Sequence, residues 1–187
     1  MKTVKLWIPI ILVTIASTGL VLGSDGEYRE KGERLWREAR LDVAPVQNEQ
    51  YAQECGACHF AYQPGLLPAR SWRHLMGNLA DHFGENAELS QEETNAITTY
   101  LVEQAADHSG FKRSEKIARS LGSDETPLRI SETRYFRKKH HEIPLSAVTD
   151  NPQVGSFSHC NKCHLKAADG SYDEHQVSIP GYGRWDD

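Results

Sequence analysis

The sequence predicts a mainly α fold, arranged as two small lobes with long loops, and three observations support it. Apolar residues recur at helical period between Trp72 and Phe83, and a helix-capping pattern occupies residues 90–93. No segment shows the alternating pattern of a strand.

The chain has 187 residues, of which 39% are hydrophobic, so its side chains alone supply little material for a large core. The net charge of −5 argues against nucleic acid as a partner, because phosphate binding needs clustered Lys and Arg.

Residues 1–23 have the pattern of a secretory signal. Lys2 and Lys5 precede an uncharged apolar run from Leu6 to Leu22. The run is about 17 residues long, near the lower limit for crossing a bilayer, so an uncleaved anchor is the alternative. In both cases we expect the folded part of the chain to lie outside the cytoplasm.

Two helices are expected in the first half of the remaining chain, before Gly84. The first covers residues 27–41 and is charged, with Leu35 and Trp36 facing inward. The second runs from Ser71 to a stop at Gly84. Its apolar stripe consists of Trp72, Leu75, Met76, Leu79 and Phe83.

Two further helices follow, each with a recognisable start. One begins at the capping box of Ser90 and Glu93 and continues to about Ala105. The other is capped by Ser131 and must end before Pro144. After residue 164 the chain is expected to consist mostly of turns.

The polar stretch 107–128, with at most a short helix near Lys116, is the natural domain boundary. We therefore predict one domain over residues 24–110 and a second over residues 111–187, after the signal at 1–23.

Two C-x-x-C-H motifs use all four cysteines of the chain. They are CGACH, residues 55–59, and CNKCH, residues 160–164. This pattern is typical of c-type haem attachment, since two thiols at this spacing reach both vinyl groups of one haem. The adjacent histidine then becomes the proximal iron ligand. We therefore predict two covalent haem c groups, held by the thiols of Cys55, Cys58, Cys160 and Cys163, with His59 and His164 as iron ligands.

Three other interpretations of the cysteines remain open. A zinc ribbon also uses two C-x-x-C pairs, but with about 15–20 residues between them, and here the pairs lie far apart. A disulfide framework suits an exported chain, yet it does not explain a histidine after each pair. A thioredoxin-like redox motif requires a βαβ setting, whereas the flanking sequence is helical.

The chain also resembles a known family. Residues 54–72, ECGACHFAYQPGLLPARSW, and residues 129–144, RISETRYFRKKHHEIP, are similar to the two halves of the bacterial dihaem cytochrome c family. The first half, with Tyr100-Leu101 in its last helix, also resembles a class I cytochrome c domain. The resemblance implies a periplasmic electron-transfer protein whose two irons each bind two histidines. It further implies redox partners such as a b-type membrane cytochrome or a small soluble monohaem cytochrome.

Three residues compete for the second ligand position of the first iron. His82 lies at the edge of the apolar stripe, in the last turn of the predicted helix, and within the family's HFGENA stretch. Met76 lies in the middle of the stripe, where methionine usually fills a core, although methionine is a known haem ligand that raises the potential. His108 follows the next helix. We expect His82 to be the ligand.

For the second iron, two neighbouring histidines are the main candidates. Phe136, His140 and Ile143 lie at i, i+4 and i+7, so His140 shares the apolar face of its helix. His141 points about 100° away from that face. The family's KH-x-E-I-P pattern also favours His140, while His159 and His175 are weaker alternatives.

Electron transport is the function that these features favour, and we expect no catalytic residues. Two irons with histidine on both sides leave no position for a substrate. A dihaem enzyme of the peroxidase kind, or a haem-based sensor, would need one open or labile iron site.

Overall fold

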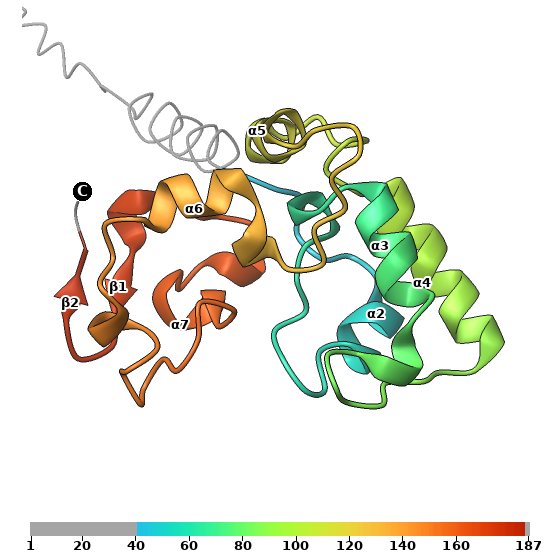
Figure 1. Ribbon diagram of the computed structural model, residues 1–187, viewed down its shortest axis with the longest axis horizontal. Helices are drawn as coiled ribbons and strands as arrows, with labels where there is room; N and C mark the ends of the chain where they lie inside the picture. The colour runs from blue at the N-terminus through green and yellow to red at the C-terminus, as the bar shows by residue number, and fades with distance from the viewer. Residues whose placement is uncertain (1–40, 186–187) are drawn as a thin grey trace, which may run out of the picture. The chain divides into compact units, whose positions relative to one another are not determined.

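The computed structural model describes residues 41–185, which belong to the compact unit formed by residues 36–187 (Figure 1). The predicted signal and the helix expected over 27–41 lie outside the described residues, except for Leu41. Six α-helices are present between residues 41 and 185, so the prediction of a mainly α fold is confirmed. They are α2 (Glu49–Glu54), α3 (Ala69–Met76), α4 (Gln91–Glu103), α5 (Lys112–Ser120), α6 (Arg134–His140) and α7 (Cys160–Cys163). None of these helices is long and apolar enough to cross a membrane.

Helices α3 and α4 pack side by side and form the first core (Figure 1). Helix α3 begins after the extended Pro68, and its Trp72 indole donates a hydrogen bond to the carbonyl of Pro64 at 2.8 Å. Helix α4 begins at the predicted capping box, in which Ser90 and Glu93 cap each other's backbone N–H groups. Ile97 and Leu101 of α4 are buried against α3, as the helical period requires.

The prediction of one continuous helix from Ser71 to Phe83 is wrong. Helix α3 ends at Met76, Gly77 caps it, and a separate 3₁₀ turn covers Leu79–Asp81. The 3.6-residue period continues through the break, because the turn keeps Leu79 against the same core. Periodicity alone therefore did not detect the end of the helix. Phe83 is no longer part of the stripe, and 45% of its surface is exposed.

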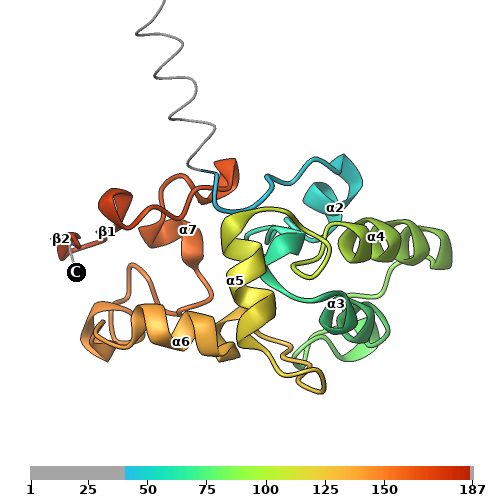
Figure 2. The ribbon, with the colours of Figure 1, turned by 90° about the horizontal axis from the view of Figure 1, so that it is seen from above.

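Helix α5 lies within the stretch predicted as a polar boundary, at the position of the short helix expected near Lys116. It packs against α6 and the 3₁₀ turn Pro64–Leu66 (Figure 2). Its Ile117 joins a core cluster whose members come from both sides of residue 110: Val43, Leu66, Ala106, Ala167 and Tyr172. Buried Gln63 accepts a hydrogen bond from the Tyr172 hydroxyl at 2.6 Å and donates one to the carbonyl of Ala167. The division into domains at residue 110 stays a prediction.

Helix α6 is capped by Thr133, so the prediction of Ser131 as the cap is wrong. Ser131 lies inside a 3₁₀ turn, Ile130–Glu132, whereas the Thr133 hydroxyl accepts a hydrogen bond from the Phe136 N–H. Both residues suit a cap, and the extended backbone of Thr133 determines which one is used. The helix ends at His140, before Pro144.

The C-terminal residues form turns and one small hairpin that the sequence pattern did not indicate. Strands β1 (Ser178–Ile179) and β2 (Gly183–Arg184) pair antiparallel. Gly181 in the connection has a φ of 79°, and Gly183 at the start of β2 has a φ of 88°, a left-handed conformation that favours glycine. Strands of two residues are too short to produce an alternating pattern.

Candidate functional site

Helix α2 leads directly into the first C-x-x-C-H motif. Cys55 caps the helix, and the next residue, Gly56, donates its N–H to the carbonyl of Ala52 at 3.1 Å. A Cβ atom on Gly56 would lie 2.1 Å from that carbonyl oxygen, so only glycine fits there. The thiol of Cys55 is half-buried, while that of Cys58 is exposed.

The rings of His59 and His82 face each other across the first site. Their centres are 6.2 Å apart and their planes differ by 18°. Bonds from imidazole to a metal are about 2.0–2.1 Å long, so two rings on opposite sides of one metal have centres about 6.3 Å apart. The Nδ1 atom of His59 lies 2.8 Å from the carbonyl of Phe60, which leaves Nε2 as the atom for a metal.

A sharp turn, not a helix end, holds His82 in this position. The residue follows the 3₁₀ turn Leu79–Asp81 and is paired with Glu85 by two backbone hydrogen bonds. Between them Phe83 has a φ of 59° and Gly84 a φ of 96°, which reverses the chain within two residues. The expectation that His82 lies in the last turn of a helix is therefore wrong, although its ring lies opposite His59.

The second C-x-x-C-H motif forms the short helix α7 and lines a cavity that is partly open to solvent. Cys160, Cys163, His164 and His140 all line it, together with apolar side chains such as Val148 and Val177. The thiols, the facing imidazoles and the apolar walls of this cavity therefore fit the chemistry of a haem c group.

The rings of His140 and His164 face each other in this cavity. Their centres are 6.1 Å apart and their planes differ by 74°. The separation again matches two imidazoles on one metal, while the mutual ring orientation differs from that at the first site. Phe136 stacks on the His140 ring at 3.8 Å, and Ile143 lines the same cavity. The face shared by these three residues in the sequence pattern is thus the face turned to the cavity.

Burial favours the neutral form of two of the facing histidines, His164 and His82, and the neutral form is the one that binds metal. Burial, with smaller effects from His140 and Arg113, lowers the pKa of His164 to about 4. Burial also lowers the pKa of His82, with smaller effects from His59 and Arg129. Each of these imidazoles therefore has its ring lone pair available near neutral pH.

Burial raises the pKa of the Cys55 and Cys160 thiols to about 11, so both are neutral thiols near neutral pH rather than the thiolates of a reactive redox pair. None of the four cysteines forms a disulfide, and no cluster of three or more His, Cys, Asp or Glu suited to a metal occurs within residues 41–185. The alternatives to haem attachment therefore have no support in the described part of the chain.

The other candidate ligands have different surroundings. Met76 is buried in the core between α3 and α4, and His108 is exposed with Nδ1 2.7 Å from the carbonyl of Val102. His141 is exposed, and its Nδ1 lies 3.0 Å from the carbonyl of Lys138. His159 lines the second cavity but contacts the carbonyl of Val154, and His175 is exposed.

Sequence reasoning did not identify Arg113, which also lines the second cavity. It lies in the stretch interpreted as a polar boundary, where one arginine among many charges carries no signal. Its partners Asp42 and Tyr172 are 71 and 59 positions away. Only the folded chain brings these residues together.

A mainly helical chain with two C-x-x-C-H motifs, each facing a second histidine, has the features of a multihaem c-type cytochrome. The family model for dihaem cytochrome c matches residues 51–172. This chain belongs to that family, and it binds two haem c groups.

Solved structures agree with this assignment. A dihaem cytochrome c from Shewanella baltica OS155 is 45% identical, with a TM-score of 0.62, over 75% of this chain and 99% of that chain. A dihaem cytochrome c from Rhodobacter sphaeroides is 41% identical, also with a TM-score of 0.62, over 70% of this chain and 100% of that chain. No curated protein shows significant similarity to the chain.

Proposed function

We propose that this dihaem cytochrome is an electron carrier in which both irons have histidine on each side. The observation that carries the proposal is the separation of the facing rings, 6.2 Å for His59 and His82 and 6.1 Å for His140 and His164. Both values match two imidazoles on opposite sides of one metal, about 6.3 Å.

Each residue of the proposed sites has a definite task. The thiols of Cys55 and Cys58 hold one haem, and those of Cys160 and Cys163 hold the other. His59 and His82 ligate the first iron, and His164 and His140 the second. Each bound haem supplies an iron that takes up and releases one electron. Because histidine replaces methionine as the distal ligand, comparatively low potentials are expected.

An enzyme of the peroxidase kind and a haem sensor remain the alternatives, since each needs an open or labile iron site. Hydrogen bonds from Nδ1–H to the backbone carbonyls of Phe60 and Phe136 fix the rings of His59 and His140, at 2.8 and 2.9 Å. Such bonds hold ring orientation and favour retained ligands. The bond at His140, the residue on the distal side of the second site, therefore supports the carrier.

We propose electron paramagnetic resonance of the oxidised holoprotein as the test. Both irons should be low-spin, and their signals should differ. At the first site the rings of His59 and His82 are nearly parallel, at 18°. Both rings then interact with the same iron dπ orbital, which separates the energies of the two dπ orbitals and gives a rhombic signal. At the second site the rings of His140 and His164 are nearly perpendicular, at 74°. Each ring then interacts with a different iron dπ orbital, so the two orbitals stay close in energy and the signal should be highly anisotropic. A stoichiometric high-spin signal would contradict the carrier and favour the enzyme or sensor.

Mass spectrometry of the same sample counts the haems and shows whether residues 1–23 are removed.

We further propose a periplasmic location, after export by residues 1–23, which supports covalent haem attachment outside the cytoplasm. A membrane-anchored form would keep those residues.

As partners we propose redox proteins, either a b-type membrane cytochrome or a small soluble monohaem cytochrome. Residues 112–139 contain nine basic and four acidic residues, whereas residues 41–110 contain two basic and ten acidic. Exposed Arg134, Arg137 and Lys138 of α6 lie close to the second site in sequence and suit a partner with an acidic surface. Added salt should slow electron exchange with such a partner, because it screens long-range attraction. A rate that does not depend on salt would contradict this docking mode.

A further inference from the structure

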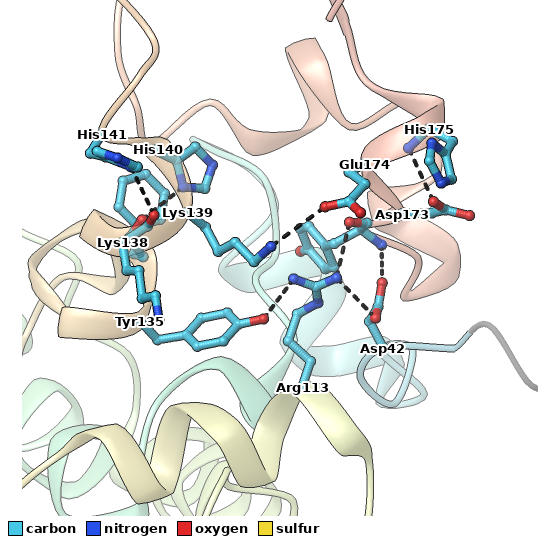
Figure 3. Close-up of polar contacts among 12 residues, drawn as sticks. Asp42, Arg113, Tyr135, Lys138, Lys139, His140, His141, Asp173, Glu174 and His175 are labelled. Atoms are coloured by element: carbon cyan, nitrogen blue, oxygen red, sulfur yellow. Dashed lines mark hydrogen bonds and ion pairs between the residues drawn. The ribbon is translucent and has the colours of Figure 1, made fainter. Parts of the chain in front are cut away.

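Arg113 is a largely buried cation in the wall of the second cavity, and Figure 3 shows its polar contacts. Only 20% of its side chain is exposed. It comes from the first turn of α5, and three groups hold its guanidinium in place. It donates to the Tyr135 hydroxyl at 2.9 Å and to the carbonyl of Tyr172 at 3.1 Å, and it pairs with Asp42 at 3.0 Å.

One donor of this guanidinium has no acceptor. Its Nε–H is buried and has no hydrogen-bond partner within residues 41–185. A buried donor without an acceptor costs about 1–3 kcal/mol, and charged groups cost more. Buried polar groups in folded proteins are nearly always paired, so a ligand that supplies an acceptor is indicated.

The surroundings determine the chemical class of that ligand. The charged side chains lining the cavity are Arg113, Lys139 and Glu174, and Lys139 pairs with Glu174 at 3.4 Å (Figure 3). The other walls are mostly apolar. A planar guanidinium with its donors in one plane is matched to a carboxylate. The site therefore suits a carboxylate attached to a large apolar body.

We propose that Arg113 binds a propionate carboxylate of the haem held by Cys160 and Cys163, with its Nε–H as donor. This inference rests on the proposed function, since it assumes a haem between His140 and His164. Asp42, Tyr135 and Tyr172 are then positioning residues that hold the guanidinium toward the cavity. Arg113 lines the same cavity as His164, so its charge would disfavour the ferric state of an iron bound there and raise its potential.

The direct test is nuclear magnetic resonance of the ¹⁵N-labelled holoprotein in its reduced, diamagnetic state. The Arg113 Nε–H resonance, assigned by its loss in Arg113→Lys, should exchange slowly with water. It should show a nuclear Overhauser effect to the propionate methylene protons of one haem. Fast exchange, or no contact with those protons, would overturn the assignment. Slow exchange without the contact would mean that another anion occupies the position.

A second test measures the two midpoint potentials by spectroelectrochemistry. Arg113→Gln should lower the potential of one haem and leave the other unchanged, while Arg113→Lys should give a smaller shift because it keeps the charge. Arg119→Gln is the matched control, since Arg119 lies on the same helix, is 77% exposed and pairs with Glu115 on the surface. An unchanged pair of potentials in Arg113→Gln would overturn the proposal. If that variant does not fold, the resonance experiment and Arg113→Lys decide.

Different results would contradict the role of Arg113 and the histidine ligation of the two irons. Loss of the Overhauser contact while both irons stay six-coordinate and low-spin contradicts only the role of Arg113. A high-spin iron in the wild-type protein contradicts the proposed ligation itself.

Discussion

Replacing His140 with Ala should open one iron of the reduced protein to carbon monoxide, whereas replacing its neighbour His141 should leave both irons closed. The His140 ring lines the second cavity and faces His164, with its Nδ1 2.9 Å from the carbonyl of Phe136. The ring of Phe136 stacks on it and fixes its plane. Removing it takes away the imidazole that faces His164.

The side chain of His141 has a different environment. It is 66% exposed, does not line the cavity, and lies 3.6 Å from the Glu142 carboxylate. The reduced His141→Ala variant should therefore not bind carbon monoxide, like the wild-type protein. Its haem midpoint potentials should shift modestly at most. The two variants remove the same side chain from neighbouring positions, so each is a control for the other. Carbon monoxide binding by His141→Ala, with His140→Ala still closed, would show that the roles are exchanged.

The second large effect is expected at the first iron. His82→Ala should leave the haem attached to Cys55 and Cys58, but convert its iron to a high-spin state that binds added imidazole or carbon monoxide. The reason is that His82 is the residue whose ring faces His59, at 6.2 Å. The absorption spectrum of the oxidised variant, before and after addition of imidazole, measures this change.

Met76→Leu is the matched control for His82→Ala. Met76 is buried in the core with Leu75 and Ile97, so a change of similar volume should cost less than about 1.5 kcal/mol of unfolding free energy. The variant should keep both irons low-spin. A charge-transfer band from iron to methionine sulfur in the wild-type protein, lost in Met76→Leu, would assign the ligand to Met76 instead.

The motifs and the helical faces follow from local sequence. Each C-x-x-C-H motif places its thiols and histidine within five residues, and tertiary packing is not needed to recognise it. The separation of His140 from His141 likewise follows from the 3.6-residue period, which is a property of one helix. The start of α6 was misplaced at Ser131, but the face depends on spacing, not on the first residue.

Other features required the folded chain, because they depend on contacts between distant residues or on a break in a regular period. His82 reaches a position opposite His59 through the break after Met76 and the reversal at Phe83 and Gly84, and the helical pattern continues through that break. Arg113 acquires its role from Asp42 and Tyr172, which approach it only when their segments pack together. A local pattern reports which face of an element is apolar. Which elements meet, and which buried donor is left for a ligand, is decided by the packing of the whole chain.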